Sequence, residues 1–178
     1  GRILAAQGED VECCAGGRPL GIRVLGIDEC LAFTAGLARP RVYVSRGLLR
    51  DLSPRELEAA LLHEVAHAER RDPLRCWLSE LVLLSLWFPR FSRLGDAYRA
   101  ARESRADIQA IVRLGDDRAL LQALHKVDAL APTPGSCGLT SEREQALRRL
   151  RADGLSPVGG EGLGLVVGLG VIAVLMVI

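Results

Sequence analysis

Aromatic residues and lysine are scarce in this 178-residue sequence: aromatics make up 4%, and Lys126 is the single lysine among 23 basic residues. Since large aromatics are few, the core must be built mainly from Leu, Ala and Val, which favours helices. The formal net charge is only +1, so the chain lacks the positive field that general nucleic-acid binding requires, and we expect no direct nucleic-acid partner. With 49% apolar and 25% charged residues, the composition is that of a folded chain of about one domain.

Cysteine is present in an odd number, five, and no two cysteines have Cys-x-x-Cys spacing. The sequence therefore predicts neither a disulfide framework nor a zinc site built from cysteines. Free thiols of this kind are typical of a reducing compartment. The five are Cys13, Cys14, Cys30, Cys76 and Cys137.

Both ends of the sequence carry information. The first residue is not methionine and no signal-peptide pattern follows it, so we expect the chain to begin inside a longer gene product. Residues 162–178 (GLGLVVGLGVIAVLMVI) contain no charge and reach the short limit of the roughly 17–25 residues of a membrane-spanning helix. Four arginines precede this run between residues 143 and 151 and none follows it. The positive-inside tendency therefore predicts a membrane protein whose residues 1–161 face the cytoplasm.

The rest of the chain divides into a short entry segment, one folded domain and a linker. Residues 1–20 are undetermined, residues 21–153 form the predicted domain, and residues 154–161 are a Gly- and Pro-containing linker to the membrane helix. Within the domain, alternating patterns predict strands at 21–27 and 41–45, with a possible third strand between them.

Helical patterns fill the remainder of the domain. Ser53 as N-cap, Pro54 at the first helical position and Glu56 in a capping box predict a helix that ends at Asp72, before Pro73. Further helices are predicted over residues 74–88, 92–114, 116–130 and 141–152. The apolar part of the second of these, residues 81–88, fits either a core helix or one dipping into the bilayer interface. The expected fold class is α+β and mostly helical.

The strongest motif is His-Glu-Val-Ala-His at residues 63–67, in the middle of the best-supported helix. His63 and His67 are four residues apart and share one helix face, so both imidazoles can reach one metal ion. Glu64 lies about 100° around the helix, where it can contact a water on that ion. Two imidazoles, one carboxylate and an open position predict a catalytic zinc site.

The third ligand must come from elsewhere in the chain. Glu103 is the candidate, and Asp107 one turn later would accept a hydrogen bond from the far nitrogen of a ligand histidine. Glu69 and Glu80 are the competitors, but Glu69 points away from the histidine face and Glu80 lies on an apolar helix close behind. His125 is expected to be a surface or core histidine of its helix rather than a ligand.

An ordered set of motifs gives the sequence a family resemblance. AFTAGLARPRVYVSRGLLRDLSPRELEAALLHEVAHAERRDPLR, then LWFP, then ESRAD, resembles the BlaR/MecR-type membrane zinc metallopeptidases, the antirepressor signal transducers of β-lactam resistance. More distantly it is similar to the CAAX-prenyl and HtpX-type membrane metallopeptidases. The resemblance covers roughly residues 21–113. It implies a gluzincin-like core with a small sheet before the zinc-binding helix.

The resemblance also implies roles for individual residues. His63, His67 and Glu103 would bind Zn²⁺, Glu64 would act as general base and acid, and Asp107 would support a ligand histidine. The strand region at residues 32–36 would border the substrate cleft. The oxyanion-stabilising donor stays open among Tyr98, His125 and several arginines.

We therefore expect a membrane-associated zinc-dependent endopeptidase that cleaves a cytoplasmic protein such as a transcriptional repressor, or itself, in signal transduction. Its partners would be this protein or peptide substrate and the lipid bilayer. One alternative is a membrane quality-control or CAAX-type metallopeptidase. Alternatives of another class are a non-catalytic zinc-bearing signalling module and a helical membrane-interaction domain in which HExxH is accidental.

Overall fold

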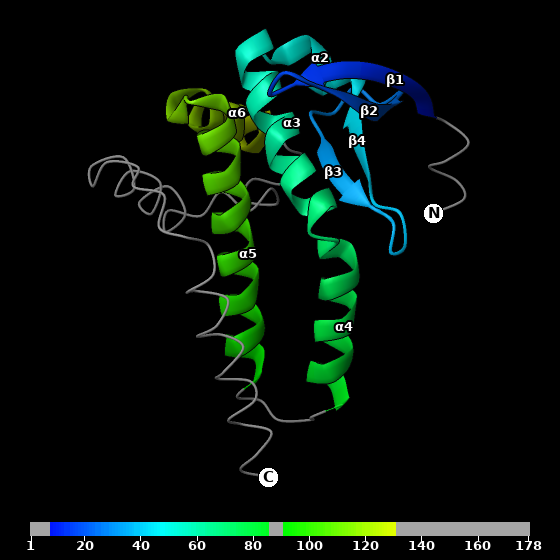
Figure 1. The fold of residues 1–178 in the computed structure, drawn as a ribbon, viewed down its shortest axis with the longest axis vertical. Helices are drawn as coiled ribbons and strands as arrows, with labels where there is room; N and C mark the ends of the chain where they lie inside the picture. The colour runs from blue at the N-terminus through cyan, green and yellow to red at the C-terminus, as the bar shows by residue number, and fades with distance from the viewer. Residues whose placement is uncertain (1–7, 86–90, 131–178) are drawn as a thin grey trace.

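A computed structural model describes residues 8–85 and 91–130, in which a small sheet is followed by five helices (Figure 1). The four strands are β1 (Gly8–Ala15), β2 (Arg18–Leu25), β3 (Ala32–Ala35) and β4 (Arg41–Ser45), arranged in the order β1-β2-β4-β3. β2 and β4 pair in parallel, while β1 and β3 pair antiparallel with their neighbours. β3 is therefore an edge strand of the described sheet.

The first hairpin lies in the segment that the sequence left undetermined. Gly16 and Gly17 connect β1 to β2 with positive φ angles of 58° and 72°, as a tight hairpin turn of the primed kind requires. β2 begins at Arg18, three residues earlier than the strand predicted at residue 21. The strand at 41–45 is confirmed as β4, and the possible strand between the two is β3.

The helices are α2 (Arg46–Asp51), α3 (Pro54–Glu69), α4 (Asp72–Ser85), α5 (Phe91–Leu114) and α6 (Asp117–Leu130). The capping box of Ser53 and Glu56 is present at the start of α3, so the prediction of this helix start is confirmed. The short helix α2 was not predicted. The sequence placed the start of α4 and both ends of α5 and α6 within two residues of those observed, whereas the predicted end of the second helix at residue 88 lies outside the described residues.

The predicted end of α3 at Asp72 is wrong, because the helix ends at Glu69. Arg71 has a φ of 53°, a left-handed conformation that reverses the chain direction between the two helices. Asp72 then becomes the first residue of α4, and Pro73 lies in the first turn of that helix, where its missing N–H is harmless. This early break decides which way the Asp72 side chain points.

α3 is the central element of the fold: it lies between the sheet and the helices α5 and α6 (Figure 1). Its buried side chains include Leu61 and Leu62, which belong to one apolar core with Val44 of β4 and Leu120 of α6. Packing against the sheet on one side and against α5 and α6 on the other holds α3 in a fixed orientation. Any group on the middle of α3 is thereby presented to α5 at a defined distance.

The observed α+β architecture confirms the predicted fold class for the part of the chain that the structure covers. Across residues 8–85 and 91–130, no helix is long and apolar enough to span a bilayer. The helix predicted at 141–152 and the membrane helix predicted at 162–178 lie outside the described residues.

Candidate active site

Two buried histidines on α3 face each other across one helical turn. The Nε2 atoms of His63 and His67 are 3.2 Å apart, and the two rings meet edge to face with their centroids 4.8 Å apart. Both side chains are buried. The i,i+4 spacing of the motif thus brings two nitrogen donors to one point, as the sequence predicts.

Glu103 reaches the same point from α5. Its Oε2 atom lies 3.3 Å from His63 Nε2 and 3.6 Å from His67 Nε2. Among the described residues these three side chains form a group able to hold a metal ion, with all ligand atoms within 4.8 Å of one another. Ligands bound tetrahedrally to zinc at roughly 2.0–2.1 Å lie about 3.3 Å apart. The observed spacings fit zinc without rearrangement of the backbone.

A carboxylate holds the far nitrogen of each histidine. His63 Nδ1 lies 2.9 Å from Asp107 Oδ1, and His67 Nδ1 lies 2.7 Å from Asp72 Oδ2. Both aspartates are buried, and Asp107 has no exposed surface. When Nδ1 carries the hydrogen, each Nε2 is left with its lone pair directed toward the common point. The two aspartates therefore fix the tautomers that metal binding needs.

The sequence predicts Asp107 behind a histidine but does not reveal the role of Asp72. In the sequence, Asp72 is only the residue before Pro73 at which α3 is expected to stop. The available signal was an acidic residue five positions after the second histidine, at the beginning of a new helix. A turn between the two helices can direct such a side chain back toward the preceding one.

The histidines and the carboxylates of the site stabilise each other's charged forms, as the shifts in the pKa values of the two histidines and Glu103 show. Burial alone would lower the pKa of His67, but the hydrogen bonds to Asp72 and Glu103 outweigh it and raise the pKa to about 9. For His63, hydrogen bonds to Asp107 and Glu103 likewise outweigh burial and raise the pKa. Burial would raise the pKa of Glu103, but the two histidines lower it well below its usual range. Without metal the site is thus a proton-sharing cluster, and a divalent cation would replace the protons.

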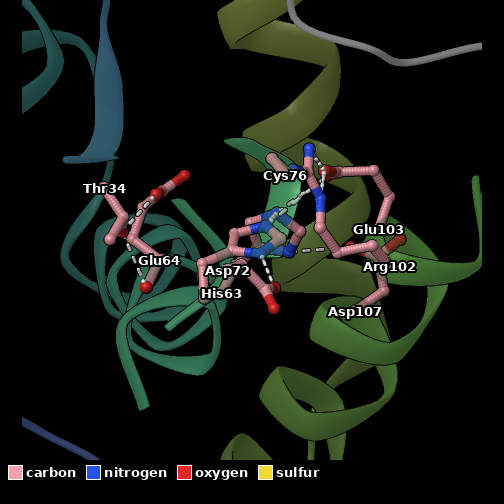
Figure 2. A network of polar contacts seen from close by, with 9 residues as sticks. Thr34, His63, Glu64, Asp72, Cys76, Arg102, Glu103 and Asp107 are labelled. Carbon is pink, nitrogen blue, oxygen red and sulfur yellow. Dashed lines mark hydrogen bonds and ion pairs between the residues drawn. The ribbon is translucent and has the colours of Figure 1, made fainter. Parts of the chain in front are cut away.

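Arg102 determines which oxygen of Glu103 faces the histidines. Its guanidinium nitrogens lie 2.9 Å and 3.3 Å from Glu103 Oε1. The same guanidinium contacts the Cys76 sulfur of α4 (Figure 2). Because Oε1 is held by Arg102, Oε2 is the oxygen directed to the common point of the ligands.

Glu64 lies beside this cluster and is held by the sheet. The Thr34 hydroxyl of β3 lies 2.8 Å from Glu64 Oε2 and 2.8 Å from the Glu64 carbonyl oxygen, so its single proton is shared between two acceptors. Figure 2 shows Glu64 turned toward Thr34 and away from His63. The sequence did not identify Thr34, because the contact depends on how β3 packs against α3.

The other residues considered for a role in the site are not among the group able to hold the metal ion. Glu69 is exposed and bonded to Gln109 and Arg113, each at 2.7 Å. Glu80 on α4 and His125 on α6 are exposed. Tyr98 is half-buried on α5, where burial raises the pKa of its hydroxyl group.

A histidine pair and a glutamate on two packed helices, beside the Glu64 carboxylate and an edge strand, form the arrangement that a metallopeptidase site needs. The family comparison agrees: the model of peptidase family M48 matches residues 15–133, which is more than half of the chain. The chain therefore belongs to peptidase family M48, whose members are metal-dependent and typically use zinc. No match was found among the curated proteins. The match to the family does not distinguish a BlaR/MecR-type from an HtpX-type protein.

Proposed function

We propose that this metallopeptidase is a membrane-associated, zinc-dependent endopeptidase that cleaves a cytoplasmic protein. The single observation that carries the proposal is the convergence of His63 Nε2, His67 Nε2 and Glu103 Oε2 at distances that fit zinc. Three protein ligands leave a fourth position for water or substrate, which is the arrangement of catalytic rather than structural zinc sites. This favours an enzyme over a non-catalytic zinc-bearing module.

The residues of the site would each have a distinct role in peptide hydrolysis. Zinc bound by the three ligands would lower the pKa of water toward about 7 and polarise the scissile carbonyl group. Glu64 takes a proton from the attacking water and later gives it to the leaving amine. Asp72 and Asp107 hold the imidazoles in the required tautomers and stabilise their orientation. Thr34 limits the movement of the Glu64 carboxylate.

The sheet offers a place for the peptide. β3 pairs with β4 on one side, and its other side is an edge of the described sheet. Thr34 of the same strand contacts Glu64, so a peptide added along this edge would pass beside the catalytic carboxylate. Backbone pairing of this kind binds extended peptides with little demand on their sequence.

The cellular setting is proposed from the sequence. The uncharged run at 162–178 and the arginines before it support a membrane anchor with the catalytic domain in the cytoplasm. The BlaR/MecR-like motif order favours a transcriptional repressor, or the protein itself, as the substrate in a signalling pathway. A quality-control or CAAX-type peptidase is the alternative, and the identity of the cleaved proteins distinguishes the two.

Proteomics of cells expressing the intact gene or its Glu64→Gln variant tests the proposal and identifies the substrate. We expect new protein termini that are present with the wild-type gene and absent with Glu64→Gln. Glu69→Gln is the matched control, because Glu69 lies on the same helix but is exposed and outside the metal centre. If wild type and Glu64→Gln give the same termini, the proposed peptidase activity is wrong.

A further inference from the structure

α4 has polar contacts on the side that faces the protein and exposed large apolar side chains on the opposite side. Asp72 contacts His67 of α3, and Cys76 contacts Arg102 of α5, so this face of the helix is turned toward the protein. On the opposite side, four large apolar side chains are about half exposed. These are Trp77 at 51%, Leu78 at 45%, Leu81 at 49% and Val82 at 53%.

These four residues, which we call the α4 face, form a continuous surface. At 100° per residue they span an arc of about 140°, centred opposite Asp72 and Cys76. Single exposed apolar residues are ordinary on a protein surface, but a contiguous group of four with a tryptophan is typical of an interaction site. In Figure 1, α4 and α5 run side by side away from the sheet, and no described element covers the side of α4 that faces away from α5.

The charges that flank the α4 face in the sequence indicate what covers it. The exposed arginines Arg71 and Arg75 lie at its start, and the sequence continues without charge from residue 81 to residue 89 before reaching Arg90 and Arg93. Glu80 is the exposed acidic residue of this helix, while the carboxylate of Asp72 is buried against His67. The apolar stretch is thus bounded by positive charge at both ends.

We propose that the α4 face is a bilayer-docking surface, by which the helix lies in the interface of a membrane containing anionic lipids. Its apolar side chains would enter the boundary of the acyl chains while the arginines contact phosphate groups. Tryptophan is enriched at this depth of a membrane. A second copy of the chain fits less well, because a parallel pairing of two α4 faces would bring the exposed arginines Arg71 and Arg75 of one copy against the same arginines of the other.

Docking would also position the metal centre. Asp72 at the N-terminal end of α4 contacts His67, so a docked α4 would hold the zinc ligands close to the membrane surface. The docking of the α4 face on the bilayer is distinct from the anchor proposed at 162–178. The inference rests on the exposure and charge of α4 and not on the proposed peptidase activity.

The depth of Trp77 in a vesicle tests the inference. The chain has two tryptophans, so Trp87→Phe in the full chain leaves Trp77 as the single tryptophan. We expect phosphatidylglycerol vesicles with brominated acyl chains to quench the fluorescence of Trp77. The same vesicles should protect this fluorescence from quenching by acrylamide dissolved in the water. At limiting lipid, Arg75→Gln should weaken the quenching by the brominated chains, because the partition coefficient of the protein onto the vesicles should fall about fivefold. One arginine near an anionic surface contributes about this factor to the partition coefficient.

Matched substitutions separate docking of α4 from anchoring elsewhere. Leu81→Asp should abolish the quenching of Trp77, whereas Val112→Asp, at an exposed valine of α5, should leave it intact. Persistent quenching of Trp77 by acrylamide on vesicle-bound protein would overturn the proposal, because another segment would then hold the chain on the membrane. Lipid-independent protection of Trp77 that grows with protein concentration would also overturn it, in favour of a second copy.

Discussion

His67 donates a hydrogen bond from Nδ1 to Asp72 Oδ2 over 2.7 Å, across the break between α3 and α4. This contact ties the second histidine of the motif to the first residue of the following helix. Together with the contact between His63 and Asp107, it gives both histidines among the candidate zinc ligands a buried carboxylate partner. The metal centre is therefore assembled by three helices, α3, α4 and α5.

Replacing Asp72 should weaken the metal site without removing it. In Asp72→Asn the charge behind His67 is lost while an acceptor of similar shape remains, so we expect zinc affinity to fall roughly 10–100-fold. Competition with a fluorescent zinc chelator measures the change. Asp96→Asn is the control, because Asp96 is exposed and paired with Arg99 on α5. Equal zinc affinity in Asp72→Asn and wild type would show that the contact does not support the ligand.

Glu64→Gln should separate metal binding from hydrolysis. Glu64 lies outside the group that can hold the ion, so its substitution should leave the zinc content unchanged. Hydrolysis of a peptide substrate should fall by roughly 10²–10⁴-fold, because an amide cannot accept the proton from water. Zinc content and rate are measured on the same preparation. Loss of zinc from this variant would mean that Glu64 is a ligand.

Thr34 should affect catalysis through Glu64. Thr34→Val removes the hydroxyl that contacts Glu64 Oε2, leaves a side chain of similar size on β3, and should lower the hydrolysis rate roughly tenfold at unchanged zinc content. Thr34→Ser restores the hydroxyl and should recover most of the rate. If Ser and Val at this position behave alike, the hydroxyl has no part in positioning Glu64.

Glu56 should stabilise the fold in a pH-dependent way. Burial alone would raise the pKa of Glu56, but hydrogen bonds from Lys126 Nζ and the Ser53 backbone N–H, each 2.7 Å, lower it. A lowered pKa means that the ionised carboxylate stabilises the folded state above the ordinary glutamate value near 4.3, and that this contribution is lost as the pH falls.

Glu56→Gln should therefore reduce the free energy of unfolding by about 1–3 kcal/mol at pH 7, since a hydrogen-bonded buried carboxylate is replaced. The difference from wild type should narrow below about pH 4. Urea unfolding at several pH values measures this. Lys126→Met, which removes one of the two donors, should show a smaller loss. A difference that is constant from pH 7 to pH 3 would exclude the ionised carboxylate as its cause.

The sequence predicted those parts of the molecule that depend on local pattern. Ser53, Pro54 and Glu56 are capping signals within a few residues, and they specify the start of α3 correctly. The i,i+4 spacing places His63 with His67 on one face of α3, and Glu103 with Asp107 on one face of α5, and the structure brings these residues together.

Features that depend on tertiary packing were not predictable in this way. β1 has mostly exposed side chains and no clear alternation, so it pairs with β2 without a hydrophobic pattern to reveal it. The role of Asp72 depends on Arg71, a non-glycine residue whose left-handed conformation no local pattern favours. The contact between Thr34 and Glu64 joins residues 30 positions apart and arises from the packing of β3 on α3.

The zinc content of purified Glu103→Gln, measured beside wild type and Glu80→Gln, tests the central claim most directly. Glu103 Oε2 completes the group formed by the two histidine nitrogens, whereas Glu80 is exposed on α4. We predict one zinc ion per chain in wild type and Glu80→Gln, and loss of most of the zinc in Glu103→Gln. A zinc-loaded Glu103→Gln beside a metal-free Glu80→Gln would contradict the account and transfer the ligand role to α4.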